Sequence, residues 1–271
     1  MFQEPFFMLS QEGYIVRASL CTGLTELRNA NIGNKGRFYS GFFQLAIGIE
    51  RLAKLALILN YMVDNNLNPP GANYVRRFNH EIDDLFTELS NLAVQRKSVT
   101  INEFQISILQ KVILEFISTF AKRTRYANLD GLGNGRVINE PVSMWNNILF
   151  KELQANVRSK TIEKAIIEGQ IMAGIMDGYI IVRSFDLQNK PMDVEDWLTI
   201  PKLVSIASKY VILDISKILR PMINLTDEIA WQAREINLKQ ERQNCKIPEL
   251  REFFWFLPKE SEYILRKKRW P

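Results

Sequence analysis

Apolar residues recur at steps of three and four through most of the chain. Between residues 39 and 66 they include Phe42, Leu45 and Ile49, a spacing that predicts a helix. Other apolar residues, such as Ile47, fall off this stripe, so that most of the circumference of the helix is apolar. A helix of this kind lies at the centre of a bundle rather than on its surface.

Three charges, Glu50, Arg51 and Lys54, lie near the middle of this apolar helix. Charged side chains in apolar surroundings cost free energy unless they are paired, so we expect these charges either to reach a solvent edge or to line something polar in the bundle. Each would cost roughly 2.5–3.5 kcal/mol at the centre of a bilayer. We therefore predict a bundle helix and no membrane segment.

The same periodicity predicts several further helices, and no strong strand alternation follows the first twenty residues. The expected helices span about 74 or 79 to 95, 103–123 with Asn102 as its cap, 142–183 with an internal break, 201–219, and 226–243. Pro221 is expected to end or kink the helix at 201–219. A glycine-rich loop is expected over 131–135. The fold class predicted is all-α, a bundle of about six to eight helices.

Glycine and aromatic residues suggest how the chain is organised. Residues 1–38 are punctuated by glycine and are expected to be irregular. Residues 39–245 form the predicted helical domain. Residues 246–271 form a tail that begins with aromatic residues, which must dock on something, and ends in the basic run 266–269. Such a run is usually solvated, although phosphate contact by it remains an alternative.

Composition limits the classes of function. The 271 residues are 46% hydrophobic and 24% charged, and 35 Lys and Arg against 30 Asp and Glu give a formal net charge of +5, which permits an anionic partner without requiring one. With two cysteines and one histidine, a zinc site of the usual kind is not expected, and no metal or cofactor is predicted. Two lone thiols favour a reducing cytoplasm.

The single histidine, His80, closely follows two arginines. Arg76 precedes it by four positions and Arg77 by three, so either arginine would share a helix face with it. A histidine can move the proton of a ribose 2′-hydroxyl, and an arginine can stabilise the charge on the attacked phosphate. The alternative is a capping or surface histidine at a helix start.

Arg125 and Tyr126 form a second polar cluster at the end of a predicted helix. A cation there can complement the helix C-terminus or bind a phosphate.

Three segments together resemble the HEPN family, the higher eukaryotes and prokaryotes nucleotide-binding helical domains. They are Gly41–Leu55 with its Glu50-Arg51 pair, Asn79–Phe86 with its Asn-His start, and Arg125–Asp130 with its Arg-Tyr. The resemblance covers roughly residues 38 to 130. It implies an all-helical bundle that often dimerises, with many members acting as metal-independent ribonucleases in prokaryotic defence or toxin–antitoxin systems and others acting as inactive scaffolds.

The resemblance also implies roles for residues. His80 would transfer the proton, Arg76 or Arg77 would hold the phosphate, and Arg125 would assist, with Glu50 orienting one of these cations. The family pattern has four to six residues between its arginine and histidine, whereas this chain has three after Arg76 and two after Arg77. Two such sites would face each other in a homodimer.

Two hypotheses remain open on this sequence. In the first, the chain binds or cleaves RNA, with Arg125, Tyr126, Glu50 and Arg51 at the substrate. In the second, it is a non-enzymatic scaffold in which these four residues form a buried polar network, and the tail docks a cognate partner protein.

Overall fold

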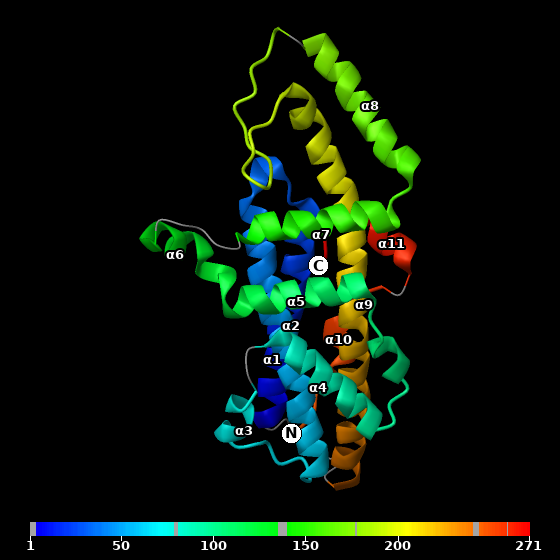
Figure 1. Cartoon of the computed structure of the whole chain (residues 1–271). Helices are drawn as coiled ribbons and strands as arrows, with labels where there is room; N and C mark the ends of the chain where they lie inside the picture. Colours follow the sequence, from blue (N-terminus) through cyan, green and yellow to red (C-terminus); the bar gives the residue numbers. More distant parts are fainter. Residues whose placement is uncertain (1–3, 79–80, 135–139, 177, 241–243, 259) are drawn as a thin grey trace.

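The computed structural model describes residues 4–78, 81–134, 140–176, 178–240, 244–258 and 260–271 of the chain (Figure 1). It is 77% helical, and these residues form no strand. Eight of their helices have seven residues or more. The predicted all-α helical bundle is therefore confirmed.

The helices follow one another along the chain as labelled in Figure 1. They are α1 (Glu4–Asn29), α2 (Gly36–Asp64), α3 (Ala72–Arg76), α4 (Ile82–Gln95), α5 (Ile108–Lys122), α6 (Ala127–Asn134), α7 (Pro141–Asn156), α8 (Ser159–Met176), α9 (Val194–Gln240), α10 (Arg251–Phe254) and α11 (Ser261–Arg266). Short 3-10 turns lie between them at η1 (Ile32–Asn34), η2 (Ile101–Phe104) and η3 (Thr124–Tyr126).

The first helix corrects the predicted organisation of the chain. α1 has 26 residues, so the expectation that 1–38 is irregular is wrong. Gly13 and Gly23 suggested breaks, but both lie where α1 touches a neighbour. A Cβ on Gly23 would lie 2.9 Å from the backbone nitrogen of Leu45 in α2. Glycine there permits close helix packing instead of a turn.

The long helices α2 and α9 run side by side along the molecule (Figure 1). α9 has 47 residues and continues through Pro201 and Pro221, so the prediction that Pro221 separates two helices is wrong. An internal proline costs a helix roughly 3 kcal/mol. Leu219 and Met222, on either side of Pro221, are fully buried, and this packing outweighs the cost of the proline.

Two shorter helices, α5 and α7, lie across α2 and α9 (Figure 1). An aromatic cluster fills the crossing: the Phe42 ring centroid lies 4.8 Å from that of Phe116, 5.2 Å from Phe120 and 5.0 Å from Trp145. The apolar α2 helix is thus central to the core, as its pattern predicts.

Several helix boundaries differ from those predicted. α5 begins at Ile108 behind a capping box formed by Ser107 and Gln110, so Asn102 is not its cap. The first part of the predicted loop 131–135 belongs to α6, and residue 135 lies outside the described residues. The long predicted helix 142–183 is divided into α7 and α8, in keeping with its expected break.

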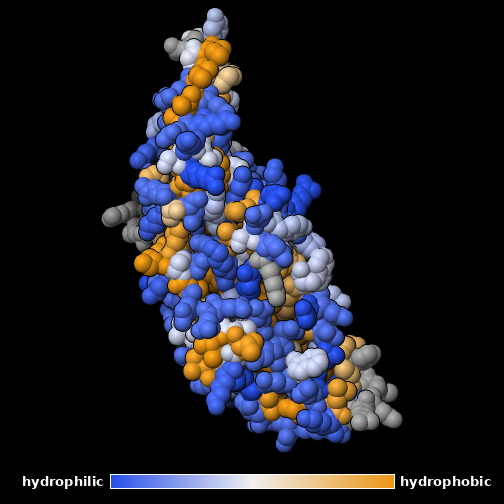
Figure 2. Space-filling view, turned by 90° about the vertical axis from the view of Figure 1, so that its right-hand side faces the viewer, coloured by the Kyte–Doolittle hydropathy of each residue, from blue (hydrophilic) through white to orange (hydrophobic). Residues whose placement is uncertain are grey.

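The outer surface varies along the molecule. α8 and the first part of α9 project at one end (Figure 1), and Figure 2 shows an apolar streak there on a mostly hydrophilic side. The tail packs against the bundle, with Phe253, Phe256 and Trp270 all buried. Among the described residues, no helix has the length and apolar character that crossing a membrane would need.

Candidate functional site

The predicted phosphate-binding arginines lie at the end of α3, with Arg76 as its last residue and Arg77 directly after it. Arg76 and Arg77 are both exposed. The Arg77 guanidinium carbon lies 4.0 Å from the ring centroid of Tyr74 and 4.8 Å from that of Phe78. These rings hold the guanidinium while leaving it open to a ligand. His80 lies outside the described residues.

The start of α4 is fastened to α5. The backbone N–H of Ile82 donates to Ser118 Oγ at 3.0 Å, and the Ser118 hydroxyl donates to Asp83. Glu81 forms an ion pair with Lys122 at the end of α5. These contacts satisfy the first donors of α4 and fix where the chain enters it.

Arg77 and Arg125 flank this contact along the chain. Arg77 precedes Glu81 by four residues, and Arg125 follows Lys122 by three. The contact between α4 and α5 therefore joins the segment before α4, which carries Arg77, to the segment after α5, which carries Arg125. The sequence indicates both arginines as candidates. It does not indicate that Ser118 and Lys122 of α5 contact the start of α4.

Arg125 and Tyr126 lie in the 3-10 turn that follows α5. Both side chains are exposed, Tyr126 by 52%, and the guanidinium carbon of Arg125 lies 5.0 Å from the Tyr126 ring centroid. This arrangement repeats that of Arg77: an open cation beside an aromatic ring.

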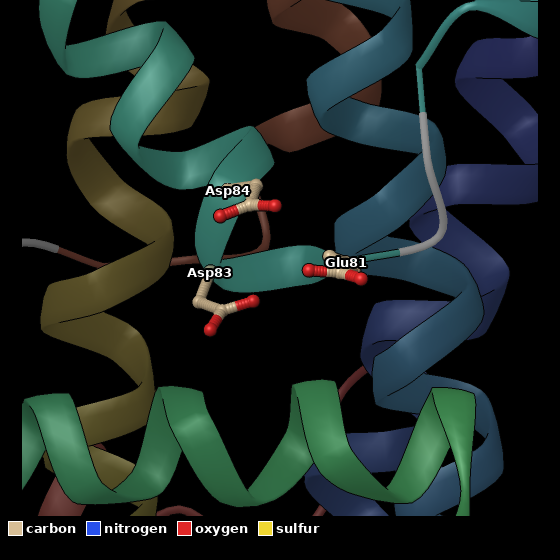
Figure 3. A group of neighbouring side chains, drawn as sticks. All are labelled: Glu81, Asp83 and Asp84. Atoms are coloured by element: carbon tan, nitrogen blue, oxygen red, sulfur yellow. The ribbon is translucent and has the colours of Figure 1, made fainter.

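A shallow cavity of about 410 Å³ adjoins Arg77. Its lining includes Phe78, Glu81, Asp84 and Glu88. The carboxylates of Glu81, Asp83 and Asp84 offer oxygens within 4.8 Å of one another and come from the first turn of α4 or just before it (Figure 3). Carboxylates are also ordinary at a helix N-terminus, where they complement its dipole, and for this reason the sequence did not single them out.

Glu50 and Arg51 lie in another part of the molecule. Arg51 Nη1 contacts both carboxylate oxygens of Glu12 in α1 at 2.8 Å, and Glu50 pairs with Lys54 at 2.8 Å. All four side chains line a cavity of about 580 Å³ between α1 and α2, which Pro69 and Pro70 also border. Glu50 and Arg51 thus line a different cavity from the one beside Arg77, and Arg125 and Tyr126 line neither of the two.

A third polar group, which sequence reasoning missed, lies inside the bundle. Glu152 of α7 is fully buried, and Asp214 of α9 is 5% exposed. Asp214 Oδ1 accepts from Gln110 and from Lys217, each at 3.0 Å, and Glu152 Oε2 accepts from Asn156 at 2.7 Å. Burial raises the pKa of Glu152 to about 7, and the neighbouring Asp214 charge adds to this effect.

Comparison with known proteins adds no identification. The chain matches no family model, no curated protein and no solved structure.

Proposed function

We propose that this chain is a HEPN-like protein that binds single-stranded RNA at Arg77 and Arg125 and cleaves it without a metal through His80. The observation that carries the proposal is the pair of exposed arginines, each beside an aromatic ring, on segments joined by the α4–α5 contact. The resemblance of three segments to the HEPN family supplies the reaction.

RNA fits this arrangement for two chemical reasons. A guanidinium binds a phosphate through paired N–H donors, and it remains charged at every physiological pH. Exposed aromatic rings stack on unpaired bases, each such contact contributing roughly 1–3 kcal/mol. Tyr126, at 52% exposure, offers such a ring beside Arg125.

The proposed reaction uses one histidine per chain. His80 removes the proton of a 2′-hydroxyl, and that oxygen attacks the adjacent phosphorus. The bond from phosphorus to the 5′-oxygen breaks, leaving a 2′,3′-cyclic phosphate on one product and a 5′-hydroxyl on the other. Arg77 stabilises the charge on the phosphorane. In a homodimer, His80 of the second copy gives the leaving oxygen its proton.

Binding is tested with a fluorescent single-stranded RNA and the double variant Arg77→Ala/Arg125→Ala. Losing two phosphate contacts lowers the slope of log affinity against log salt by about 1.4, which corresponds to about 25-fold weaker binding at roughly 0.1 M salt. A matched control removes Arg158 and Arg183, two exposed arginines elsewhere. Equal losses in both variants would show that only overall charge matters and would contradict the proposal.

A specific observation favours a second function, that of a non-enzymatic interaction protein. The outward face of α8 carries Ile167, Ile171 and Ile175, which are 53%, 59% and 64% exposed. The buried network expected of Glu50, Arg51, Arg125 and Tyr126 is not formed, because Arg51 pairs with Glu12 near the surface and Arg125 and Tyr126 are exposed in another part of the molecule. An intact RNA population after incubation with wild-type protein, together with capture of a cognate protein that is lost on Ile171→Asp, would favour this function.

A further inference from the structure

The basic end of the chain is held in place on the bundle. The backbone N–H of Trp270 donates to Thr25 Oγ1 at 2.9 Å, and Asn29 Nδ2 donates to the carbonyl oxygen of Lys268 at 2.7 Å. Trp270 is 6% exposed, and Ile264 in α11 is fully buried. Both hydrogen bonds use backbone atoms of the tail, so they fix its path without occupying its charged side chains.

Those charged side chains point to solvent. Arg266, Lys268 and Arg269 are exposed. Within the described residues, Lys268 and Arg269 take part in no ion pair, and Arg266 pairs with Glu262 while its side chain stays 79% exposed. Ion pairs at such exposure are weak, so an anionic ligand can compete for Arg266.

Two exposed aromatic rings lie beside cations in this region. Lys267 Nζ lies 5.0 Å from the ring centroid of Tyr263, and the Arg17 guanidinium carbon lies 5.2 Å from that of Trp255. Tyr263 is 55% exposed and Trp255 61%. Each ring therefore has open surface beside a cation.

Arg17 of α1 lies near the path of the tail. Thr25, which accepts the hydrogen bond from Trp270, lies about two turns after Arg17 on the same face of α1. Lys267 Nζ lies 5.9 Å from the Trp270 ring centroid. Burial raises the pKa of the Cys21 thiol, which lies on α1 between Arg17 and Thr25, to about 12. We call the surface made by these five cations and two rings the C-terminal basic strip. Its members are Arg17, Trp255, Tyr263, Arg266, Lys267, Lys268 and Arg269.

We propose that the C-terminal basic strip is a second binding surface for single-stranded RNA, separate from the α4–α5 site. Its cations follow the phosphate backbone, and Tyr263 and Trp255 stack on bases. Cations combined with exposed aromatic rings are what sequence-tolerant single-strand binders use. Because the tail is already ordered, binding does not have to offset the entropy of fixing it.

The test measures binding of a fluorescent single-stranded RNA of about 20 nucleotides, a length greater than the roughly 4–16 nucleotides that one such surface covers. In Lys268→Ala/Arg269→Ala, losing two phosphate contacts lowers affinity about 25-fold at roughly 0.1 M salt and reduces the salt slope by about 1.4. Trp255→Leu, which keeps the charge, weakens binding about 5- to 150-fold through the lost stacking.

Lys160→Ala/Lys164→Ala on α8 is the matched control, because both lysines are exposed and lie outside the strip. Circular dichroism of each variant checks that the fold is kept. A loss in the control equal to that in Lys268→Ala/Arg269→Ala would overturn the proposal. An unchanged RNA affinity in Lys268→Ala/Arg269→Ala would also overturn the proposal. This holds even if the variant loses binding to phosphatidylserine vesicles, because that result would assign the strip to a membrane surface instead of RNA.

The two RNA proposals can fail separately. If Arg77→Ala/Arg125→Ala binds RNA like the wild type while Lys268→Ala/Arg269→Ala does not, the strip stands and the α4–α5 site fails. The reverse pattern removes the strip and keeps the site.

Discussion

Replacing Glu152 by glutamine should make the protein less sensitive to rising pH. Glu152 is fully buried and has a pKa raised from 4.5 to about 7. Its Oε1 has no hydrogen-bond donor among the described residues, while Asp214 stands beside it. These surroundings favour the neutral, protonated carboxyl group of Glu152. Glutamine has the same shape as that group and carries no charge.

The sign follows from proton binding in the two states. Below the unfolded pKa of 4.5, both states hold the proton and the group has no effect on stability. Between that value and about 7, the unfolded chain loses the proton while the folded chain keeps it, so stability falls as pH rises. Above the folded pKa, both states have lost the proton and the stability does not fall further from this group.

The magnitude follows from the two pKa values. They differ by about 2.5, and one pKa unit corresponds to about 1.4 kcal/mol, so Glu152 lowers the free energy of unfolding by about 3 kcal/mol at alkaline pH. In Glu152→Gln the amide can donate to Asp214 and accept from Asn156. The variant should match the wild type in acid and exceed its stability by about 3 kcal/mol near pH 8.

Denaturant unfolding followed by circular dichroism, at several values between about pH 4 and pH 8, measures this difference. Glu163→Gln on α8 is the control, since Glu163 is exposed and should give a constant difference from the wild type. A difference between Glu152→Gln and the wild type that does not grow with pH would show that ionisation of Glu152 does not destabilise the fold.

Two further predictions concern the contacts that position the helices. Ser118→Ala leaves the Ile82 N–H without its acceptor and should cost about 1–3 kcal/mol of unfolding free energy, measured in urea; Ser118→Thr, which keeps a hydroxyl, should cost less. Gly23→Ala places a methyl group against Leu45 and should lower stability by about 1–3 kcal/mol. Gly174→Ala, where no atom lies within 4 Å, should raise it by up to about 1 kcal/mol. Equal changes in melting temperature for Gly23→Ala and Gly174→Ala would contradict the close approach of α1 to α2.

The sequence predicts the core more accurately than the edges. The central helix was expected over 39–66 and is found at Gly36–Asp64, because its apolar periodicity is strong and its burial is high. Around Gly23 and Pro221 the local signal predicts breaks, yet the helices continue. In both places, contacts with distant segments outweigh the local preference, and one sequence does not show those contacts.

The candidate site was predictable in part for the same reason. Arg77 and Arg125 stand out as cations at helix ends, and the structure leaves both exposed. The rings beside them and the Ser118 hydroxyl become recognisable only when the helices pack. The buried pair Glu152 and Asp214 carries no local signal, since each is one carboxylate within an ordinary helix.

The proposed function is tested most directly by a cleavage assay on total cellular RNA in the presence of a chelator, with wild type beside His80→Ala. We expect cleavage by the wild type, products with 2′,3′-cyclic phosphate ends, and loss of cleavage in the variant. Intact RNA with both proteins, or equal cleavage by both, would contradict the proposed function.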